Sequence, residues 1–321
     1  MHYTLNVNKC ITFALLLCLP TFAQVSNLDV KSTLDGTMQP NYFVAAEGDA
    51  PRPLLVSLHS WSNGFNTDTG DGMRSWERAA KARNWHLLQP HFRGPNKTPE
   101  GCGSELARQD ILDAVDAVVS QHKVDPSRIY LAGASGGGHM AMVMAGHAPE
   151  RWTAVSAWVG ISDLAAWYRE CKESDHRYWE HLDTAIGGAP GTSDEIDAAY
   201  TYRSPIHHLA KAKDVPLDIS VGIHDGHSGS VPIHHSLDAF NVIAKARGDA
   251  EISAVEIERL SKREGLKENL PLDPAYGRGL HLQQQSGPCR ITVFEGGHEG
   301  LPETACVFLG THIKQIENPT E

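Results

Sequence analysis

The sequence is poor in basic residues and lacks internal repeats, low-complexity segments and, beyond its first residues, long apolar runs. Its 28 lysines and arginines stand against 39 aspartates and glutamates, a formal net charge of −11. That balance excludes a typical nucleic-acid partner, because phosphate binding requires clustered Lys and Arg. No internal apolar run is long enough to span a bilayer, so we expect no membrane insertion. The 321 residues therefore suit one large globular domain.

Cysteine is scarce too, and none of the six cysteines stands at C-x-x-C spacing, so we expect no cysteine metal site. Four of them lie beyond the first residues, and an exported chain with four cysteines favours disulfides. Four cysteines allow three pairings. We predict Cys102–Cys171 and Cys289–Cys306, the second of which would link the last strand to the last helix.

The N-terminus has the pattern of a secretory signal. Lys9 precedes the apolar run CITFALLLCLP, and the small-residue site TFA ends at Ala23, before Gln24. Leu19 after Cys18 argues against a lipoprotein anchor, and a buried first strand is the alternative. We expect a signal peptide at 1–23, a single catalytic domain at 24–321, and a secreted or periplasmic protein.

Apolar runs alternate with amphipathic patterns along the rest of the chain. Near-continuous apolar strands between helices predict an α/β protein with a mostly parallel sheet covered on both faces. Ser104 is expected to cap the clearest helix. The predicted strands are 42–46, 54–59, 85–90, 128–133, 152–160, 215–224 and 289–296; the predicted helices are 73–84, 104–122, 231–246, 306–316 and one from about 137.

Two segments interrupt this alternation and look like insertions. Residues 163–210 are rich in Trp and Tyr, and we expect them to form either a cap that lines a substrate cleft or a plain surface excursion. Residues 248–288 are polar with a short helix at 251–262, and we expect a surface excursion there.

The stretch GASGG, residues 133–137, fits G-x-S-x-G and lies between a predicted strand and a predicted helix. This is the context of a nucleophile elbow, in which glycines allow a sharp turn that lifts the serine above the sheet. Ser135 is therefore the candidate nucleophile. The N–H of Gly136, at the helix N-terminus, would point to a developing oxyanion.

A serine nucleophile needs a base, and the base needs an orienting acid. Asp225 and His298 each follow the end of a predicted strand, in the order Ser, Asp, His that this motif requires. We assign Asp225 as the acid and His298 as the base. Asp163 and Glu299 are the rival acids.

The loop HSWSNG after the strand 54–59 should supply the second oxyanion donor, from the backbone N–H of Ser60 or, as we prefer, Trp61. We also expect four side chains to contact the substrate: Trp61, His59, Trp158 and Trp167.

Histidine pairs at 207–208 and 234–235, and the run HDGH, raise the alternative of a metal. A catalytic zinc needs three ligands in fixed geometry, and adjacent histidines on a helix should point apart. We therefore predict no catalytic metal and no cofactor, and leave open a structural calcium near the acidic insertion.

These residues resemble the α/β-hydrolase superfamily, in its esterase and prolyl-oligopeptidase-like branch. The segments LLVSLHSWSNG, DPSRIYLAGASGGGHMAMVMAG, VGIHDGHSGSVPIHHS and FEGGHEG carry the resemblance. The second is similar to secreted feruloyl and acetyl xylan esterases and polyhydroxybutyrate depolymerases, the third to peptidases of the prolyl oligopeptidase type. The resemblance implies Ser135, Asp225 and His298 as the triad, and Gly136 and Trp61 as oxyanion donors. His59-Ser60 departs from the usual His-Gly.

Three functions follow, in order of preference. The first is a secreted ester hydrolase that removes acetyl or feruloyl groups from a plant or algal polysaccharide. The second is a prolyl-oligopeptidase-type peptidase, which we rank lower because residues 24–53 leave no room for the propeller of such enzymes. The third is a non-catalytic binding domain, ranked last because all three triad positions hold competent residues.

Overall fold

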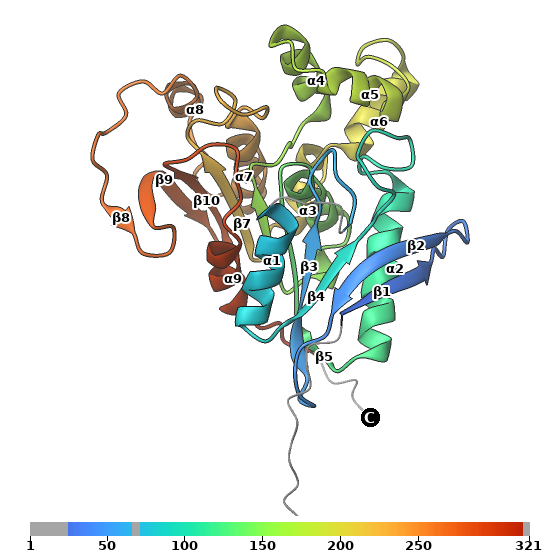
Figure 1. Ribbon diagram of the computed structural model, residues 1–321. Helices are drawn as coiled ribbons and strands as arrows, with labels where there is room; N and C mark the ends of the chain where they lie inside the picture. The colour runs from blue at the N-terminus through green and yellow to red at the C-terminus, as the bar shows by residue number, and fades with distance from the viewer. Residues whose placement is uncertain (1–24, 66–70, 317–321) are drawn as a thin grey trace, which may run out of the picture.

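Parallel strands form the centre of a ten-stranded sheet in the computed structural model, which describes residues 25–65 and 71–316. The strand order is β1-β2-β4-β3-β5-β6-β7-β10-β9-β8, parallel from β4 to β10 and antiparallel at both edges (Figure 1). The central strands are mostly apolar, as expected for strands covered on both faces, with single buried polar residues such as Asp218 and Thr292. They are β4 (His86–Pro90), β3 (Arg52–Leu58), β5 (Val124–Ala134), β6 (Ala154–Trp158), β7 (Leu217–Gly222) and β10 (Cys289–Phe294).

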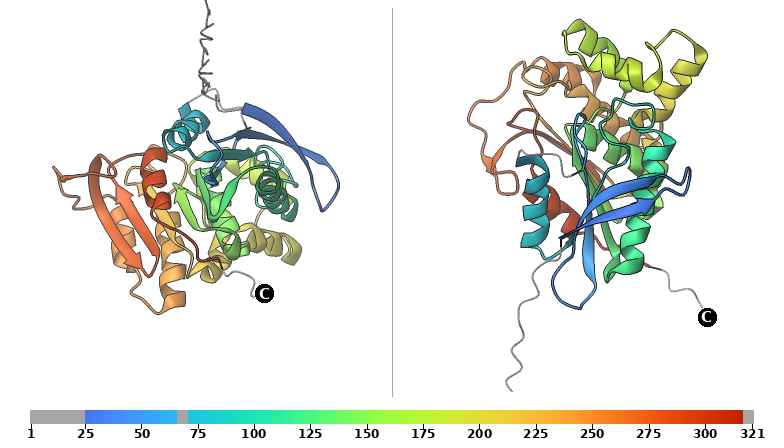
Figure 2. Two further views of the ribbon diagram at one scale, coloured as in Figure 1. Left: turned by 90° about the horizontal axis from the view of Figure 1, so that it is seen from below. Right: turned by 45° about the vertical axis from the view of Figure 1, so that its right-hand side comes forward.

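Helices cover both faces of this sheet (Figure 2). On one face lie α1 (Asp71–Ala82) and α9 (Pro302–Gly310); on the other lie α2 (Glu105–Gln121), α3 (Gly136–His147) and α7 (His234–Arg247). The predicted cap of α2 is present, since the Ser104 hydroxyl accepts a 3.1 Å hydrogen bond from the N–H of Ala107. The predicted mostly parallel α/β sheet is thus confirmed. The last helix, predicted at 306–316, begins earlier, because Pro302 suits the first turn of a helix, and it ends at Gly310.

The sequence analysis predicted only one strand of the two antiparallel edges, at 42–46. At one edge, β1 (Val25–Lys31) and β2 (Met38–Val44) form a hairpin; at the other, β9 (Arg278–Ser286) and the short β8 (Leu272–Asp273) follow α8 (Ala254–Ser261). The segment 248–288 is therefore part of the sheet. Its short helix is present as predicted.

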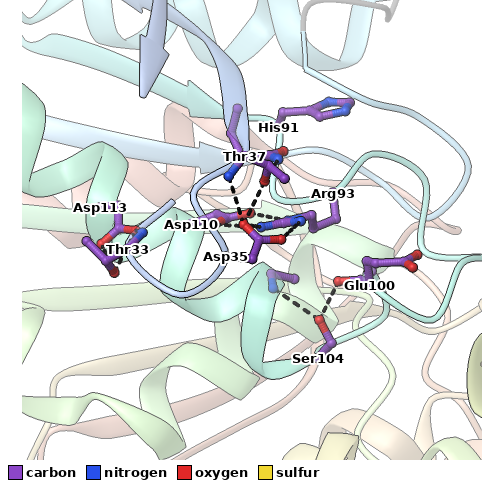
Figure 3. Close-up of polar contacts among 12 residues, drawn as sticks. Thr33, Asp35, Thr37, His91, Arg93, Glu100, Ser104, Asp110 and Asp113 are labelled. Atoms are coloured by element: carbon purple, nitrogen blue, oxygen red, sulfur yellow. Dashed lines mark hydrogen bonds and ion pairs between the residues drawn. The ribbon is translucent and has the colours of Figure 1, made fainter. Parts of the chain in front are cut away.

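An ionic network fastens the β1–β2 hairpin to α2, as Figure 3 shows. Arg93 makes ion pairs with Asp35 in the hairpin turn, at 2.8 Å, and with the buried Asp110 of α2. One turn further along α2, Asp113 accepts a 2.7 Å hydrogen bond from the N–H of Thr33. Hydrogen bonds from Arg93 and Thr37 hold the pKa of Asp35 well below its usual range.

The segment 163–210 contains three α-helices, which lie beyond one end of the sheet at the top of Figure 1. They are α4 (Leu164–Glu173), α5 (Tyr178–Ile186) and α6 (Asp194–Arg203), and we call them the cap. The cap has an apolar cluster of its own, which includes Trp167, Tyr168 and Tyr200 and also takes in Trp61. The cap therefore packs on the loop that follows β3.

The predicted disulfides are wrong, because Cys102, Cys171, Cys289 and Cys306 are all free and buried. The guanidinium of Arg290 lies 4.5 Å from the ring centroid of Phe308 on α9, so the preceding residue, Cys289, points to the opposite face of the sheet. It cannot reach Cys306, which is on α9. Burial raises the pKa of the Cys306 thiol to about 12.

Cys102 and Cys171 share the apolar cluster of the cap without being bonded to each other. Burial raises the pKa of each thiol to about 12. The signal peptide predicted at 1–23 lies outside the described residues. Among the residues that the structure describes, no helix has both the length and the apolar character needed to cross a membrane.

Candidate active site

Ser135 lies at a sharp turn between β5 and α3. Its backbone angles are φ 58° and ψ −120°, a combination that L-residues rarely adopt. The turn is held by a 2.9 Å hydrogen bond from the Ser135 N–H to the carbonyl of Trp158. Glycine is required beside it, because a Cβ on Gly137 would overlap the carbonyl oxygen of Leu58 in β3. The sequence GASGG therefore forms the predicted elbow.

The structure brings the three predicted triad residues together. The Oγ of Ser135 lies 2.8 Å from Nε2 of His298, and Nδ1 of the same ring lies 2.7 Å from Oδ2 of Asp225. His298 follows β10 and Asp225 follows β7, so all three residues stand at the carboxyl end of the parallel strands. This is a continuous hydrogen-bonded chain from hydroxyl to imidazole to carboxylate.

The Asp225 carboxylate is fully buried and oriented by its own loop. Its Oδ1 accepts hydrogen bonds from the N–H of Gly226, at 2.9 Å, and of Val231, at 3.4 Å. Gly229 packs directly against the pair, since a Cβ there would lie 2.5 Å from the Cβ of His298. We call residues 225–232 the acid loop. Its fold leaves Oδ2 free to face the imidazole.

The two rival acids have other partners. Asp163 caps α4, where its Oδ1 accepts from the N–H groups of Ala165 and Ala166 at 2.9 and 3.0 Å. Glu299 pairs with Arg278 through both carboxylate oxygens, at 2.5 and 2.9 Å. That pairing, with a hydrogen bond from the N–H of Gly297, lowers the pKa of Glu299.

The predicted oxyanion donors lie against each other. A Cβ on Gly136 would overlap the backbone nitrogen of Trp61 and lie 2.5 Å from its Cα. Gly136 is the first residue of α3, and the first N–H groups of a helix have no acceptor within the helix. The loop after β3 is fixed in turn by a 2.8 Å hydrogen bond from the N–H of Asn96 to the carbonyl of Trp61.

A cavity of about 320 Å³ opens above Ser135 and His298. It is lined by residues of α1, the cap, and the loops after β3, β5, β6, β7 and β10. Most of the large ones are apolar or aromatic, and Glu299 adds a carboxylate at the rim. Besides Ser135, His298 and Glu299, the cavity is lined by Leu58, Ser60, Trp61, Ser62, Gly72, Met73, Trp76, Ala134, Val159, Tyr178 and Ser230.

Of the four predicted substrate-binding side chains, only Trp61 lines this cavity. His59 lies beneath it, stacked on Phe92 at 3.8 Å, with Nε2 2.9 Å from the carbonyl of His91. Burial lowers the pKa of His59 to about 4. Trp158 is in the core, where its Nε1 donates to the Ser156 hydroxyl. Both predictions are wrong because these rings point into the protein.

Trp167 forms a second layer behind the cavity. Its ring lies 4.8 Å from that of Trp61 in an edge-on arrangement and 5.2 Å from that of Tyr178 in a stacked one. Its Nε1 donates a 2.8 Å hydrogen bond to the carbonyl of Ser230 in the acid loop. Trp167 thus supports two lining residues, while the sequence analysis placed it in contact with substrate.

The sequence analysis missed Met73, Trp76, Tyr178 and Val159 as lining residues. Tyr178 belongs to the aromatic-rich segment that was expected to line a cleft, so a signal for it existed. The expectation that His234 and His235 point apart is wrong. Their rings are stacked at 4.5 Å, and both approach Glu170 of α4.

The chain is similar to known hydrolases in sequence. Residues 105–258 match the Prolyl oligopeptidase family. Dipeptidyl-peptidase 5 of Porphyromonas endodontalis is 31% identical over 117 residues, 36% of this chain and 16% of that protein. Poly(3-hydroxyalkanoate) depolymerase C of Paucimonas lemoignei is 26% identical over 163 residues, 47% of this chain and 36% of that protein. The chain thus spans well under half the length of either relative.

The same fold occurs in solved peptidase structures. Acylaminoacyl peptidase of Pyrococcus horikoshii superposes with a TM-score of 0.61 at 15% identity, over 94% of this chain and 43% of that one. An identity this low establishes shared architecture only. Together with the strand order, these matches show that the chain shares the fold of those peptidases and that residues 105–258 are similar in sequence to the Prolyl oligopeptidase family.

Proposed function

We propose that the protein is a serine hydrolase that cleaves acyl bonds in short peptides through an acyl-enzyme on Ser135. The observation that carries the proposal is the chain of hydrogen bonds from Ser135 through His298 to Asp225, at 2.8 and 2.7 Å. A serine hydroxyl becomes an effective nucleophile only beside such a base, and the base is effective only when a carboxylate orients it.

In the first half of the reaction, Ser135 Oγ attacks the carbonyl carbon while His298 Nε2 takes its proton. Asp225 holds the proton on Nδ1 and stabilises the imidazolium that forms. The N–H groups of Gly136 and Trp61, at the positive end of α3, stabilise the oxyanion. His298 then gives its proton to the leaving group, which departs and leaves the acyl group on Ser135.

In the second half, a water molecule takes the place of the leaving group. His298 removes a proton from the water as its oxygen attacks the acyl carbon. Collapse of the second tetrahedral intermediate breaks the bond to Ser135 Oγ, which recovers the proton from His298. The products are a carboxylic acid and the free enzyme.

Two observations support a peptide substrate. The Prolyl oligopeptidase match covers the segment that contains Ser135 and Asp225, and the dipeptidyl-peptidase relative is named for peptide cleavage. The cavity of about 320 Å³ is at the small end of ligand sites, which suits one apolar side chain beside the scissile bond. The peptidase reading therefore replaces the ester hydrolase as our first choice.

An ester hydrolase remains the second candidate, favoured by the similarity to a poly(3-hydroxyalkanoate) depolymerase. An ester differs at one step. Its alcohol leaves more readily than an amine, so the protonation by His298 matters less. A triad that cleaves amides also cleaves activated esters, and only the ratio of rates distinguishes the two functions.

The test compares initial rates on matched pairs of substrates. N-acetyl-Phe and Gly-Pro would be offered as p-nitroanilides, and N-acetyl-Phe and acetate as p-nitrophenyl esters, beside methyl ferulate and acetylated xylan. Turnover of the anilides that disappears in Ser135→Ala supports the peptidase. Turnover of esters alone supports the second candidate. A Ser135→Ala protein as active as the wild type contradicts both.

A further inference from the structure

The inner side of cap helix α4 contacts the acid loop and the start of α7. Trp167 and Glu170 are three residues apart and so lie on one face of this helix. Trp167 donates to the carbonyl of Ser230 at 2.8 Å. The Glu170 carboxylate accepts from Nε2 of His234 at 2.7 Å with one oxygen, and from Nε2 of His235 at 2.9 Å with the other.

Protons, rather than a metal ion, bridge this cluster. The Nδ1 atom of His235 faces the backbone N–H groups of Ser162 and Asp163 at 3.4 Å, so it accepts, and the ring proton is on Nε2, toward Glu170. A metal would require the lone pair at that same Nε2. The three atoms that could ligate a metal, one each from Glu170, His234 and His235, lie within 4.8 Å of one another. In this tautomer they already hydrogen-bond to each other.

His234 lies between two carboxylates. Its Nδ1 is 3.0 Å from Asp238 and its Nε2 is 2.7 Å from Glu170, so both ring nitrogens donate. Burial lowers the pKa of His234, but the hydrogen bonds to Asp238 and Glu170 outweigh it and raise the value to about 9. The stabilisation from this imidazolium is therefore complete below its unfolded pKa of about 6.5 and is lost as the pH rises through about 9.

Close packing connects this cluster to the catalytic acid. Pro232 lies three residues before His235, and its carbonyl accepts a 3.2 Å hydrogen bond from the His235 N–H. A Cβ on Gly226 would lie 2.7 Å from the Cα of Pro232, so the two ends of the acid loop touch. Between them, the N–H of Val231 donates to Asp225. A shift of the α7 start would therefore displace the carboxylate that holds His298.

We propose that Glu170 is a positioning residue: through His234 and His235 it fixes the acid loop so that Asp225 stays aligned with His298. The proposal rests on the proposed serine-hydrolase function and assigns to the cap a second role besides lining the cavity. Glu170 is not among the residues that line the cavity, and its carboxylate bonds to His234 and His235 rather than to the triad. It acts through the acid loop, together with the hydrogen bond from Trp167 to Ser230.

The central variant is Glu170→Gln, which keeps the shape of the side chain. Glutamine has one oxygen for one histidine and turns an NH₂ group toward the other, which also donates. The matched control is Glu173→Gln, one turn further along α4. Glu173 is exposed, lines the same small pocket beside Glu170 and loses the same charge.

We expect Glu170→Gln to lower kcat about tenfold at pH 7 and to leave KM within about twofold, because misalignment by a fraction of an ångström is costly in the transition state. Glu173→Gln should match the wild type. The downfield proton resonance of the His298–Asp225 hydrogen bond should weaken or shift in Glu170→Gln only. Unchanged kcat and an unchanged resonance in a folded Glu170→Gln protein would overturn the proposal.

The pH profile separates positioning from simple stability. The groups that face His234 are Glu170 from α4 and Asp238 and His235 from α7, with Glu173 and His176 at the adjoining pocket. The wild type should lose kcat above about pH 9, while Glu170→Gln, already misaligned, should lack that additional fall. Profiles of the same shape would contradict the proposal.

Failure of the proposed function would be seen separately. If the wild type hydrolyses none of the substrates and a fluorophosphonate does not label Ser135, the hydrolase function fails, while the downfield resonance still tests the alignment. Zinc bound in the purified wild-type protein and lost in Glu170→Gln would show a metal centre in place of the proton bridge, and would also overturn the proposal.

Discussion

A Cβ atom on Gly136 would lie 2.5 Å from the Cα of Trp61. The two proposed oxyanion donors are thus in backbone contact, which only glycine permits at position 136. We predict that Gly136→Ala pushes the loop after β3 away and lowers kcat at least about a hundredfold, with a smaller change in KM. Steady-state kinetics on the p-nitrophenyl ester of N-acetyl-Phe measures this. A wild-type kcat in the folded variant would show that Trp61 is not a donor.

Ser135→Ala removes the nucleophile and keeps the turn. We expect kcat to fall at least about a thousandfold, to what oxyanion binding alone supports. The thermal unfolding midpoint should stay close to that of the wild type, because the backbone hydrogen bonds of the elbow remain. Covalent labelling by a fluorophosphonate, followed by mass spectrometry, should disappear in the variant; labelling of another serine would contradict the assignment.

Asp225→Asn tests the acid. An asparagine amide at this position places an NH₂ group against the N–H of Gly226 and Val231, or else turns it to the imidazole and forces the wrong tautomer. We predict a loss of about a thousandfold to ten-thousandfold in kcat. Asp163→Asn, whose carboxylate caps α4, is the control and should retain most activity. The reverse order of effects would make Asp163 the acid.

The four described cysteines should behave as free, shielded thiols. Native protein should react slowly with iodoacetamide, because burial raises the pKa of Cys102, Cys171 and Cys306 to about 12. After unfolding without a reductant, peptide mapping should find all four alkylated, Cys289 included. A disulfide-linked pair of peptides among them would refute the prediction of free thiols. Dithiothreitol should leave the thermal unfolding midpoint of the native protein unchanged.

The ion pair between Asp35 in the β1–β2 turn and Arg93 should make the stability of the protein depend on pH in the acid range. Because the pKa of Asp35 is lowered in the folded state, its contribution to stability is complete above its unfolded pKa of about 3.9 and is lost progressively as the pH falls from there through the lower folded-state pKa. Asp35→Asn should therefore lower the urea midpoint at pH 7 and lower it less near pH 3. Equal effects at both values would mean that the pair with Arg93 is not the cause.

The sequence predicted the arrangement of the candidate triad well because its signals are local. The glycines of the elbow and the strand before Ser135 lie within a few residues of each other. Asp225 and His298 each follow an apolar strand directly. Their convergence then follows from the parallel sheet alone, whose strands all end at the same edge.

The sequence failed where contacts depend on distant parts of the chain. The pairing of His234 and His235 on Glu170 is made by packing of the cap on α7, which helical periodicity does not indicate. The direction of the His59 ring is set by the loop that contains His91 and Phe92.

The edge strand β1 is different. Leu28 and Val30 alternate with polar neighbours, so a period of two was present and went unused. A strand signal of that kind extends the predicted sheet by its first strand, which pairs with β2.

The order of the strands also bears on how the molecule acquires activity during folding. Ser135 and His298 are 163 residues apart, and the base is carried by β10, which sits between β7 and the late hairpin strand β9. Contacts between such distant residues form slowly. During refolding, the chain should therefore bury its tryptophans and form α2 and α3 before Ser135 reacts with a fluorophosphonate. The time at which Ser135 becomes reactive would then report when β10, which precedes His298, docks on the sheet.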